Sequence, residues 1–369
     1  MVNAGYCPGA FRTLASFLAI RDTGRGRLDS VHEAGKSNES RAGRETLLLG
    51  VCGFMGLLSV ASLLAWAFRL GRFDHWFAAV GAPAILTIFV VGIWVGRTRR
   101  YPRVRTALIV GVAGGLLGTV GYDLFRIPFV ILGLRLFAPI ESYGVLLLGA
   151  DSSSPWTHLA GWAYHFSNGL GFGIFYACVA LGRKWWWGLA WAMVLETATI
   201  VTPFASTYAI RGKWGLIAIA YAAHVAYGVP LGKVVEAGDR FSAGLLSISP
   251  RPIRWILGGL AVALLLWHRP WSTPSEFRNG SSVAPGASAV VVDSKFSPDW
   301  LRIAPGGCAT IRNDDEEIYQ IDIARGKPSL RPGRVQKICF DTPGVHRVRT
   351  SKRPYSGGFV IVDPALAPA

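Results

Sequence analysis

The chain has 369 residues, of which 51% are hydrophobic and only 16% are charged. A soluble globular protein averages about 25% charged residues, so this composition excludes an ordinary soluble domain. The formal net charge of +16 is typical of nucleic-acid-binding proteins, but the sequence holds no nucleic-acid-binding motif. Much of the positive charge lies at the ends of apolar segments, where it sets membrane topology. We therefore expect a protein that contacts the lipid bilayer and no nucleic acid.

The N-terminal region, residues 1–44, carries seven Lys/Arg and many small polar residues. It lacks the apolar core followed by a small-residue cleavage site that marks a secretory signal peptide. We expect a disordered basic tail on the cytoplasmic side of the membrane.

Apolar runs long enough to cross a bilayer recur between residues 45 and 270, which we predict to be a transmembrane helical domain. One apolar segment, 127–150, is ambiguous because Arg135, Pro139 and Glu141 interrupt it. The clear spans are 46–68, 76–96, 106–126, 157–181, 185–205, 214–232 and 253–268.

The distribution of basic residues decides whether 127–150 crosses. The loop 96–105 is the densest basic cluster, and it follows the second span on the same side as the tail. If 127–150 does not cross, Arg183 and Lys184 also fall on that side, as the positive-inside rule requires. We predict seven spans, with 127–150 as a re-entrant or interfacial hairpin on the outer side. This orientation in the cytoplasmic (inner) membrane puts the C-terminal domain in the periplasm; an eight-span alternative leaves it in the cytoplasm.

Ionisable and polar residues recur inside three of the predicted spans, where such groups usually face the bundle interior. At about 1.5 Å per residue, His165, Glu196 and His224 come to a common depth below the outer end of their helices. Imidazole and carboxylate groups together form a ligand set for zinc, iron or copper. The polar residues concerned are His158, His165, Asn168, Glu196, His224 and Tyr227.

Three roles for these residues stay open. His165, Glu196 and His224, with His158 nearby, form a transition-metal or haem site, or they carry protons or ions, or they only hydrogen-bond and hold the bundle together. At the outer end of the third span, Asp123 and Arg126 are three residues apart. They can pair on one helical face and support the same site.

From residue 288 the pattern changes to short alternating runs between Pro, Gly and Asp turns. Two such stretches are "SAVVVDSKFSPDWLRIAPGGCATIRNDDEEIYQIDI" and "RVQKICFDTPGVHRVRTSKRPYSGGFVIV". Short strands at this spacing predict an all-β sandwich over 288–364, joined to the membrane domain by the linker 271–287.

The order of motifs in this region resembles the cupredoxin family, the plastocyanin-like copper proteins. The resemblance implies a Greek-key sandwich. The motifs that carry it are "FSPDWLRIAPGG" for the opening strand and turn, "ATIRNDD" for the strand before the first copper ligand, "FDTPGVHRVRT" for the strand leading to the ligand loop, and "GGFVIV" for the closing strand.

The copper-ligand positions depart from the family. Its first His corresponds here to Tyr319, or to Ile318 if the alignment slips by one residue. Its Cys-x-x-His-x-x-Met cluster corresponds to Thr350, Arg353 and Ser356. Because a type 1 copper site needs a thiolate and two imidazoles, we predict that this domain holds no type 1 copper.

The cupredoxin arrangement also places the strand 308–313 beside the strand 335–341, with Cys308 and Cys339 both facing outward. Two such cysteines on neighbouring strands can form a disulfide. A disulfide implies an oxidising compartment, in agreement with the seven-span orientation. The alternative is a pair of unlinked thiols.

Two functions follow from these observations. The first is a membrane-anchored binding or assembly protein, whose outer domain docks a periplasmic or membrane protein near copper or respiratory chemistry; it rests on fold analogy. The second is a membrane enzyme, or a carrier of metal ions or protons, that uses His165, Glu196 and His224.

Overall fold

The computed structural model describes residues 41–131, 140–207, 212, 214–247, 286–323, 326–350 and 357–362. The predicted seventh span at 253–268 and the copper-position residues Arg353 and Ser356 lie outside the described residues, as do most of the predicted tail and linker. The chain divides into two units, Met1–Leu49 and Gly50–Ala369. All that follows concerns the second unit, apart from the bounds of the helix that joins the two.

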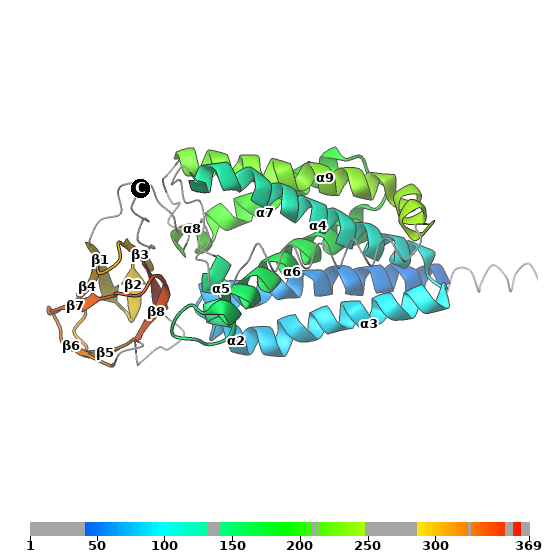
Figure 1. Ribbon diagram of the computed structural model, residues 1–369. Coiled ribbons are helices and arrows are strands. Elements are labelled where there is room, and N and C mark those ends of the chain that lie inside the picture. The colour runs from blue at the N-terminus through cyan, green and yellow to red at the C-terminus, as the bar shows by residue number, and fades with distance from the viewer. Residues whose placement is uncertain are drawn as a thin grey trace, which may run out of the picture. The chain divides into compact units, whose positions relative to one another are not determined.

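The described residues up to 247 are helical (Figure 1), and we call residues 50–247 the helical part. The first helix is Arg41–Ala67. It is followed by α2 (Phe73–Trp76), the π-helical turn η1 (Phe77–Gly81), α3 (Ala82–Thr98), α4 (Pro102–Ile131), α5 (Ile140–Leu147), α6 (Pro155–Ala180), α7 (Trp186–Val201), α8 (Phe204–Thr207) and α9 (Trp214–Ser247).

Among the described residues, four helices are long and apolar enough to cross a membrane: Arg41–Ala67, Phe73–Thr98, Pro102–Arg126 and Trp214–Ser247. They include four of the predicted spans. The helix α6 has the required length, 26 residues, but is more polar than these four, and the apolar α7 has only 16 residues. The seven-span topology stays a prediction.

The ambiguous segment 127–150 divides between two helices. The third predicted span does not end at residue 126, because α4 continues to Ile131 through Pro128. A proline in the last turn of a helix removes only one backbone hydrogen bond there, so the helix tolerates it. The helix α5 has eight residues, about 12 Å of length, which is too short to cross a hydrocarbon layer of about 30 Å.

Glycines bring α4 into close contact with α6 and α9. A Cβ atom added at Gly115 would lie 2.7 Å from the Gly169 carbonyl oxygen on α6. One added at Gly118 would lie 2.8 Å from the Tyr227 carbonyl oxygen on α9. The small-residue spacing of 111–121 is typical of such close helix packing.

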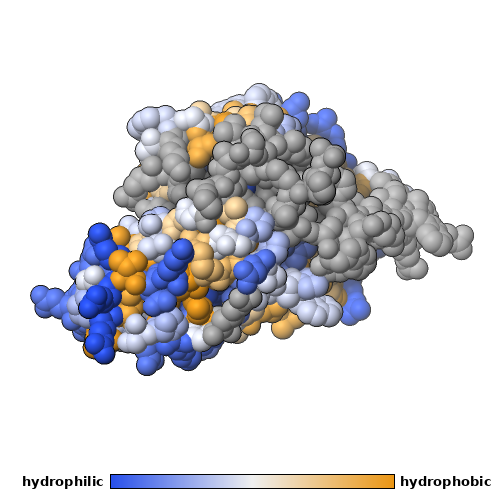
Figure 2. Space-filling view, turned by 60° about the vertical axis from the view of Figure 1, so that its left-hand side comes forward, coloured by the Kyte–Doolittle hydropathy of each residue, from blue (hydrophilic) through white to orange (hydrophobic). Residues whose placement is uncertain are grey.

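The helical part exposes apolar side chains, as expected of a surface in contact with lipid. On α3 the exposed residues include Ile85, Leu86, Phe89, Val90, Ile93 and Trp94. The face of the molecule in Figure 2 combines both kinds of residue, with strongly hydrophilic residues around a few strongly hydrophobic ones.

The described residues 286–362 form two β-sheets, which we call the sandwich. The strands are β1 (Gly286–Val292), β2 (Lys295–Ser297), β3 (Trp300–Ile303), β4 (Cys308–Asn313), β5 (Tyr319–Asp322), β6 (Ser329–Leu330), β7 (Val335–Cys339), β8 (Gly344–Thr350) and β9 (Gly357–Val362). One sheet has the order β2-β1-β4-β7 and the other β3-β9-β8-β5-β6. Alternate residues of the strands fill one apolar core, for example Val291, Ile303, Ile311, Ile321 and Val360.

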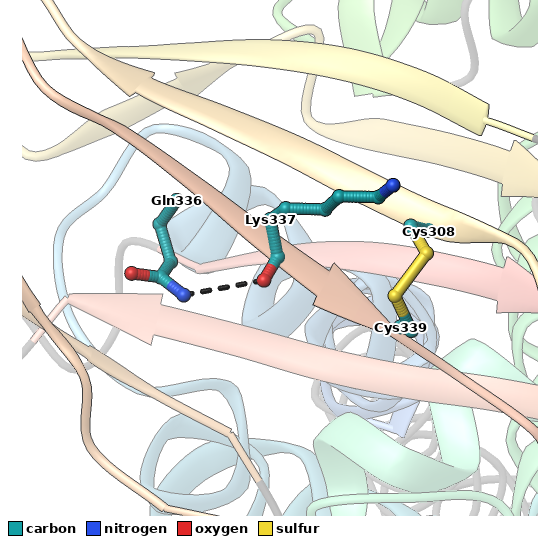
Figure 3. Close-up of a disulfide and its surroundings, with 4 residues drawn as sticks. All are labelled: Cys308, Gln336, Lys337 and Cys339. Atoms are coloured by element: carbon teal, nitrogen blue, oxygen red, sulfur yellow. Dashed lines mark hydrogen bonds between the residues drawn. A yellow bond between two sulfur atoms is a disulfide. The ribbon is translucent and has the colours of Figure 1, made fainter.

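The register of β4 against β7 pairs Cys308 with Cys339 and Ala309 with Ile338. Ala309 and Ile338 are buried in the core, so the two cysteines face the other side of the sheet. Their sulfur atoms form a disulfide (Figure 3). The predicted disulfide is therefore confirmed, and the alternative of unlinked thiols is wrong.

The loop between α5 and α6 pairs with the edge of β8, at residues of β8 that β5 does not reach. The Ser153 amide donates to the Val345 carbonyl oxygen at 2.8 Å, and the Val345 amide donates to Ser153 Oγ at 3.0 Å. The Arg347 amide donates to the Asp151 carbonyl oxygen at 2.8 Å. The β5 strand pairs with β8 only at its end, at Arg349 and Thr350. Residues 151–153 therefore extend the sheet where β5 stops.

Apolar side chains reinforce this junction. Val345, Phe359 and Ile361 of the sandwich belong to one buried cluster with residues of the helical part, including Leu63 and Trp66. An ion pair between Arg69 and Asp299, at 3.5 Å, adds a second polar link. The remaining members of the buried cluster are Phe73, Val145, Leu146, Tyr164 and Phe204.

Candidate functional site

A polar cavity of about 160 Å³ lies within the helical part. This volume has room for several water molecules. His165 of α6, Glu196 of α7 and His224 of α9 all line it, so the three helices turn their predicted polar faces toward one another. The other polar lining residues are Thr119, Tyr122, Arg126, Tyr143, Asn168, Thr199 and Tyr227.

Two residues that line the cavity, His165 and Arg126, share the carboxylate of Asp123 as a partner. His165 Nε2 lies 2.9 Å from Asp123 Oδ2, and Arg126 Nη1 donates to Asp123 Oδ1 at 3.4 Å. The expected pairing of Asp123 with Arg126 thus forms, and it includes His165. The Arg126 guanidinium also stacks over the ring of Tyr122, 5.2 Å from its centroid, a cation–π contact.

Glu196, whose side chain is 0% exposed, also lines the cavity. Its Oε2 atom lies 3.1 Å from His224 Nδ1. That nitrogen is also 3.0 Å from the Ala220 carbonyl oxygen, which can only accept, so the Nδ1 proton points to the backbone. Among the described residues, neither carboxyl oxygen of Glu196 has a hydrogen-bond partner. A buried polar group in this state is unfavourable unless it is protonated or contacts something in the cavity.

Asn168 and Tyr227 complete the set of predicted supporting residues. The Tyr227 hydroxyl donates to the Gly169 carbonyl oxygen at 2.8 Å and joins α9 to α6. Asn168 Oδ1 is buried and, within the described chain, has no hydrogen-bond partner. Together with Glu196 it offers acceptors to the cavity, which match a water molecule or another proton donor.

The fourth predicted ligand, His158, does not line the cavity. Its Nδ1 atom lies 2.8 Å from Glu141 Oε1 on α5, and both residues are buried. In the sequence, Glu141 interrupts the apolar run of the predicted outer hairpin, which suggests that it approaches the region of Asp123 and Arg126 but does not pair it with His158. A charged residue that interrupts an apolar segment was the signal available.

The described residues thus hold three carboxylate–imidazole pairs: Asp123 with His165, Glu141 with His158, and Glu196 with His224. In the part of the chain that the structure describes, no group of three or more His, Cys, Asp or Glu side chains is close enough to hold a metal ion. The metal site stays a prediction. Each of the candidate histidines lies beside one carboxylate.

In the sandwich, the two described positions that the resemblance aligns with copper ligands, Tyr319 and Thr350, are buried. Tyr319 is 1% exposed, its hydroxyl donates to Asp315, and it accepts from the Ser294 amide at 3.1 Å. Burial, and then the bond to Asp315, raise the pKa of the Tyr319 hydroxyl. Thr350 is wholly buried and lies opposite Ile321 on β5.

Comparisons with known proteins concern the sandwich only. No protein-family model matches the chain, and no curated protein matches it. Among solved structures, a purple cupredoxin from Nitrosopumilus maritimus is 26% identical over 21% of this chain and 99% of its own, with a TM-score of 0.19. An oxidised mutant of amicyanin is 16% identical over 23% of this chain and 94% of its own, with a TM-score of 0.20.

A third similar structure is a copper-containing nitrite reductase from Thermus scotoductus SA-01. It is 22% identical over 22% of this chain and 23% of its own, with a TM-score of 0.20. The structural neighbours are cupredoxins, and the similarity is confined to about a fifth of the chain.

Proposed function

We propose that this is a multi-pass membrane protein whose helical part exchanges protons in the cavity around Glu196. The single observation that carries the proposal is the state of Glu196. Its carboxyl group is fully buried, lines the cavity together with His165 and His224, and lacks a hydrogen-bond partner among the described residues. Binding a proton, or passing it on through water, relieves the unfavourable burial of the charged form.

The neighbouring groups suit proton exchange. Histidine is the side chain whose ordinary pKa lies closest to neutral pH, and chains of Asp, Glu and His form proton relays in membrane proteins. Water in a cavity of this size can bridge the carboxyl and imidazole groups. Arg126 also lines the cavity, and its positive charge disfavours a metal cation more than a neutral water molecule.

A transition metal held by His165, Glu196 and His224 is the second candidate. The observation that favours it is that these residues line one cavity. Metal analysis of the purified protein tests it: stoichiometric metal that disappears in the His165→Ala and His224→Ala variants supports a metal site. Purified protein with neither metal nor haem absorbance counts against it.

For the sandwich we propose a docking role on the outer, periplasmic side of the cytoplasmic membrane, without type 1 copper. The disulfide supports this location, because disulfides persist in oxidising compartments. Tyr319 and Thr350 offer no thiolate or imidazole, so electron transfer through a type 1 centre is not part of the proposal. A partner protein near copper or respiratory chemistry remains an argument from fold analogy.

The proton-exchange proposal is tested with the full-length protein in liposomes that enclose a pH-sensitive dye. We expect an imposed pH difference to relax through the wild type, and the Glu196→Gln variant to slow this relaxation about tenfold or more. A matched control is Glu236→Gln. Glu236 does not line the cavity, and its Oε1 atom lies 3.3 Å from Lys184 Nζ. Wild-type relaxation in Glu196→Gln, or none in the wild type, contradicts the proposal.

A further inference from the structure

We propose that Glu141 and His158 form a second proton-binding site, through which the cavity exchanges protons with the side of the membrane that carries the sandwich. This inference rests on the proposed function of the cavity and adds the route by which protons reach it. Four features of the described residues carry it: burial, an unsatisfied carboxyl oxygen, position along α6, and the nearby loop 151–153 that contacts the sandwich.

The pair is deeply buried. Glu141 is 7% exposed and His158 is 5% exposed. Glu141 Oε1 lies 2.8 Å from His158 Nδ1, while Oε2 has no hydrogen-bond partner among the described residues. A surface ion pair would have both oxygens in water. Here one oxygen is left without a donor, so the carboxyl group is better satisfied when it takes up a proton.

Along α6, His158 lies between the loop 151–153, which contacts β8, and His165, which lines the cavity. His158 and His165 are seven residues apart on this helix, about 10 Å along its axis. The Trp162 ring lies between them, with centroids 6.4 Å from His158 and 5.7 Å from His165. On α5, Ile140 precedes Glu141 and lines the cavity. Glu141 is thus next in sequence to a residue of the cavity wall.

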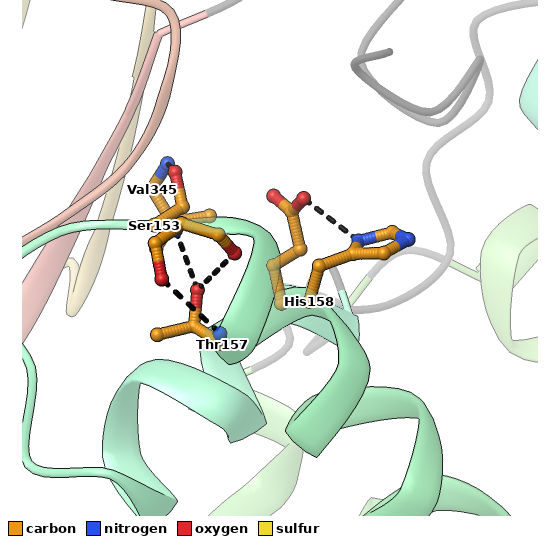
Figure 4. Close-up of polar contacts among 6 residues, drawn as sticks. Ser153, Thr157, His158 and Val345 are labelled. Carbon is orange, nitrogen blue, oxygen red and sulfur yellow. Dashed lines mark hydrogen bonds and ion pairs between the residues drawn. The ribbon is translucent and has the colours of Figure 1, made fainter. Parts of the chain in front are cut away.

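His158 lies in the first turn of α6, close to the loop in which Ser153 contacts Val345 of the sandwich (Figure 4). Thr157, next to His158, closes the N-terminal cap of α6: its amide donates to Ser154 Oγ at 3.2 Å, and the Ser154 amide donates to Thr157 Oγ1 at 2.7 Å. Ser153, the residue before Ser154, accepts a hydrogen bond from the Val345 amide of β8. The pair thus lies at the end of α6 that the sandwich holds in place.

The other titratable groups on the elements packed against α5 have partners of their own or are exposed. On α6, His165 pairs with Asp123. On α2, Asp74 pairs with Arg72, and His75 is exposed. On β8, Arg349 pairs with Asp151, His346 donates to the Thr342 carbonyl oxygen, and Arg347 stays charged at neutral pH although burial lowers its pKa to about 10.

The test measures protonation of buried carboxyl groups by infrared difference spectroscopy on oriented membranes of the full-length protein. A pH jump is applied to one side at a time. We expect a carboxylic-acid band that Glu141→Gln removes and a separate band that Glu196→Gln removes. We also expect Glu141→Gln to slow protonation of Glu196 about tenfold after a jump on the sandwich side, and to leave jumps on the other side unchanged.

The outcomes separate the two proposals. If Glu196 titrates as before from both sides in Glu141→Gln, the second site is refuted and the cavity proposal stands. If Glu196 never titrates, the cavity proposal fails. In that case a Glu141 band that titrates shows that Glu141 binds a proton, and a band that does not titrate refutes the second site. The His158→Asn variant keeps the carboxyl group and should shift the pH at which its band titrates. An unshifted band contradicts the pairing even if Glu141→Gln does not fold.

Discussion

The helical part and the sandwich differ in the polar groups that they bury, although each holds one without a hydrogen-bond partner among the described residues, such as Thr350 Oγ1 in the sandwich. The core of the sandwich is a cluster of apolar side chains, and its Tyr319 and Asn313 are tied by hydrogen bonds to Asp315, Ser294, Glu317 and Leu330. The helical part buries carboxyl and imidazole groups in pairs, and leaves oxygens of Glu141 and Glu196 without donors among the described residues.

This difference indicates where the chemistry of the molecule lies. Burying an ionisable group is unfavourable, and such groups inside membrane helices usually serve function. In the sandwich, Tyr319 and Thr350 are buried, whereas the carboxyl–imidazole pairs of the described residues lie in the helical part.

The largest expected effect concerns the disulfide of the sandwich. The double variant Cys308→Ser with Cys339→Ser removes a link across 31 residues, and the loop-entropy relation gives a loss of roughly 3–4 kcal/mol in the free energy of unfolding. Because the disulfide lies within the sandwich, proton exchange in the helical part should persist. Denaturant unfolding monitored separately in the two regions checks this, and equal destabilisation of both would mean that they unfold together.

A second variant tests the helical side. A Cβ atom at Gly144 of α5 would overlap the Thr157 carbonyl oxygen of α6, so Gly144→Val should separate the two helices and reduce stability by about 3 kcal/mol. It should also disturb the Glu141–His158 pair. The control is Gly215→Ala on α9, where an added Cβ meets nothing within 4 Å. Thermal unfolding in detergent is the measurement, and equal melting temperatures for both variants would contradict the packing described.

The smallest expected effect concerns Tyr319 of the sandwich. Tyr319→Phe keeps the ring in the core but removes the hydroxyl that bonds Asp315 and Ser294, which should reduce the stability of the sandwich by about 1–2 kcal/mol. Chemical denaturation of the full-length protein measures it. A loss below the detection limit would show that water replaces both hydrogen bonds.

Much of this arrangement is predictable from local patterns. Alternation of apolar residues predicts the strands and puts Ala309 and Ile338 in the core. That the strands of Cys308 and Cys339 are neighbours, as the disulfide requires, is implied by the cupredoxin resemblance. Helical spacing and rise predict that His165, Glu196 and His224 lie at a common depth, but not that their helices turn these faces toward one cavity. The strands and the common depth depend on the periods of helix and strand, which are written in neighbouring residues.

Other features depend on contacts that no local pattern records. Glu141 pairs with His158 because α5 packs on α6 through Gly144 and Gly161, and α4 continues past the predicted end because its last turn tolerates Pro128. The three-residue pairing of 151–153 with β8 is likewise invisible in sequence, since it is too short to show alternation.

The pairing of residues 151–153 with β8 means that the sandwich is not complete within its own stretch of chain. Ser153 hydrogen-bonds to Val345 across 192 positions. A fragment cut before β1 would leave part of the β8 edge unpaired and would expose Val345, Phe359 and Ile361. An unpaired edge beside an apolar patch promotes association between copies. The smallest autonomous unit that contains the sandwich therefore includes the loop between α5 and α6.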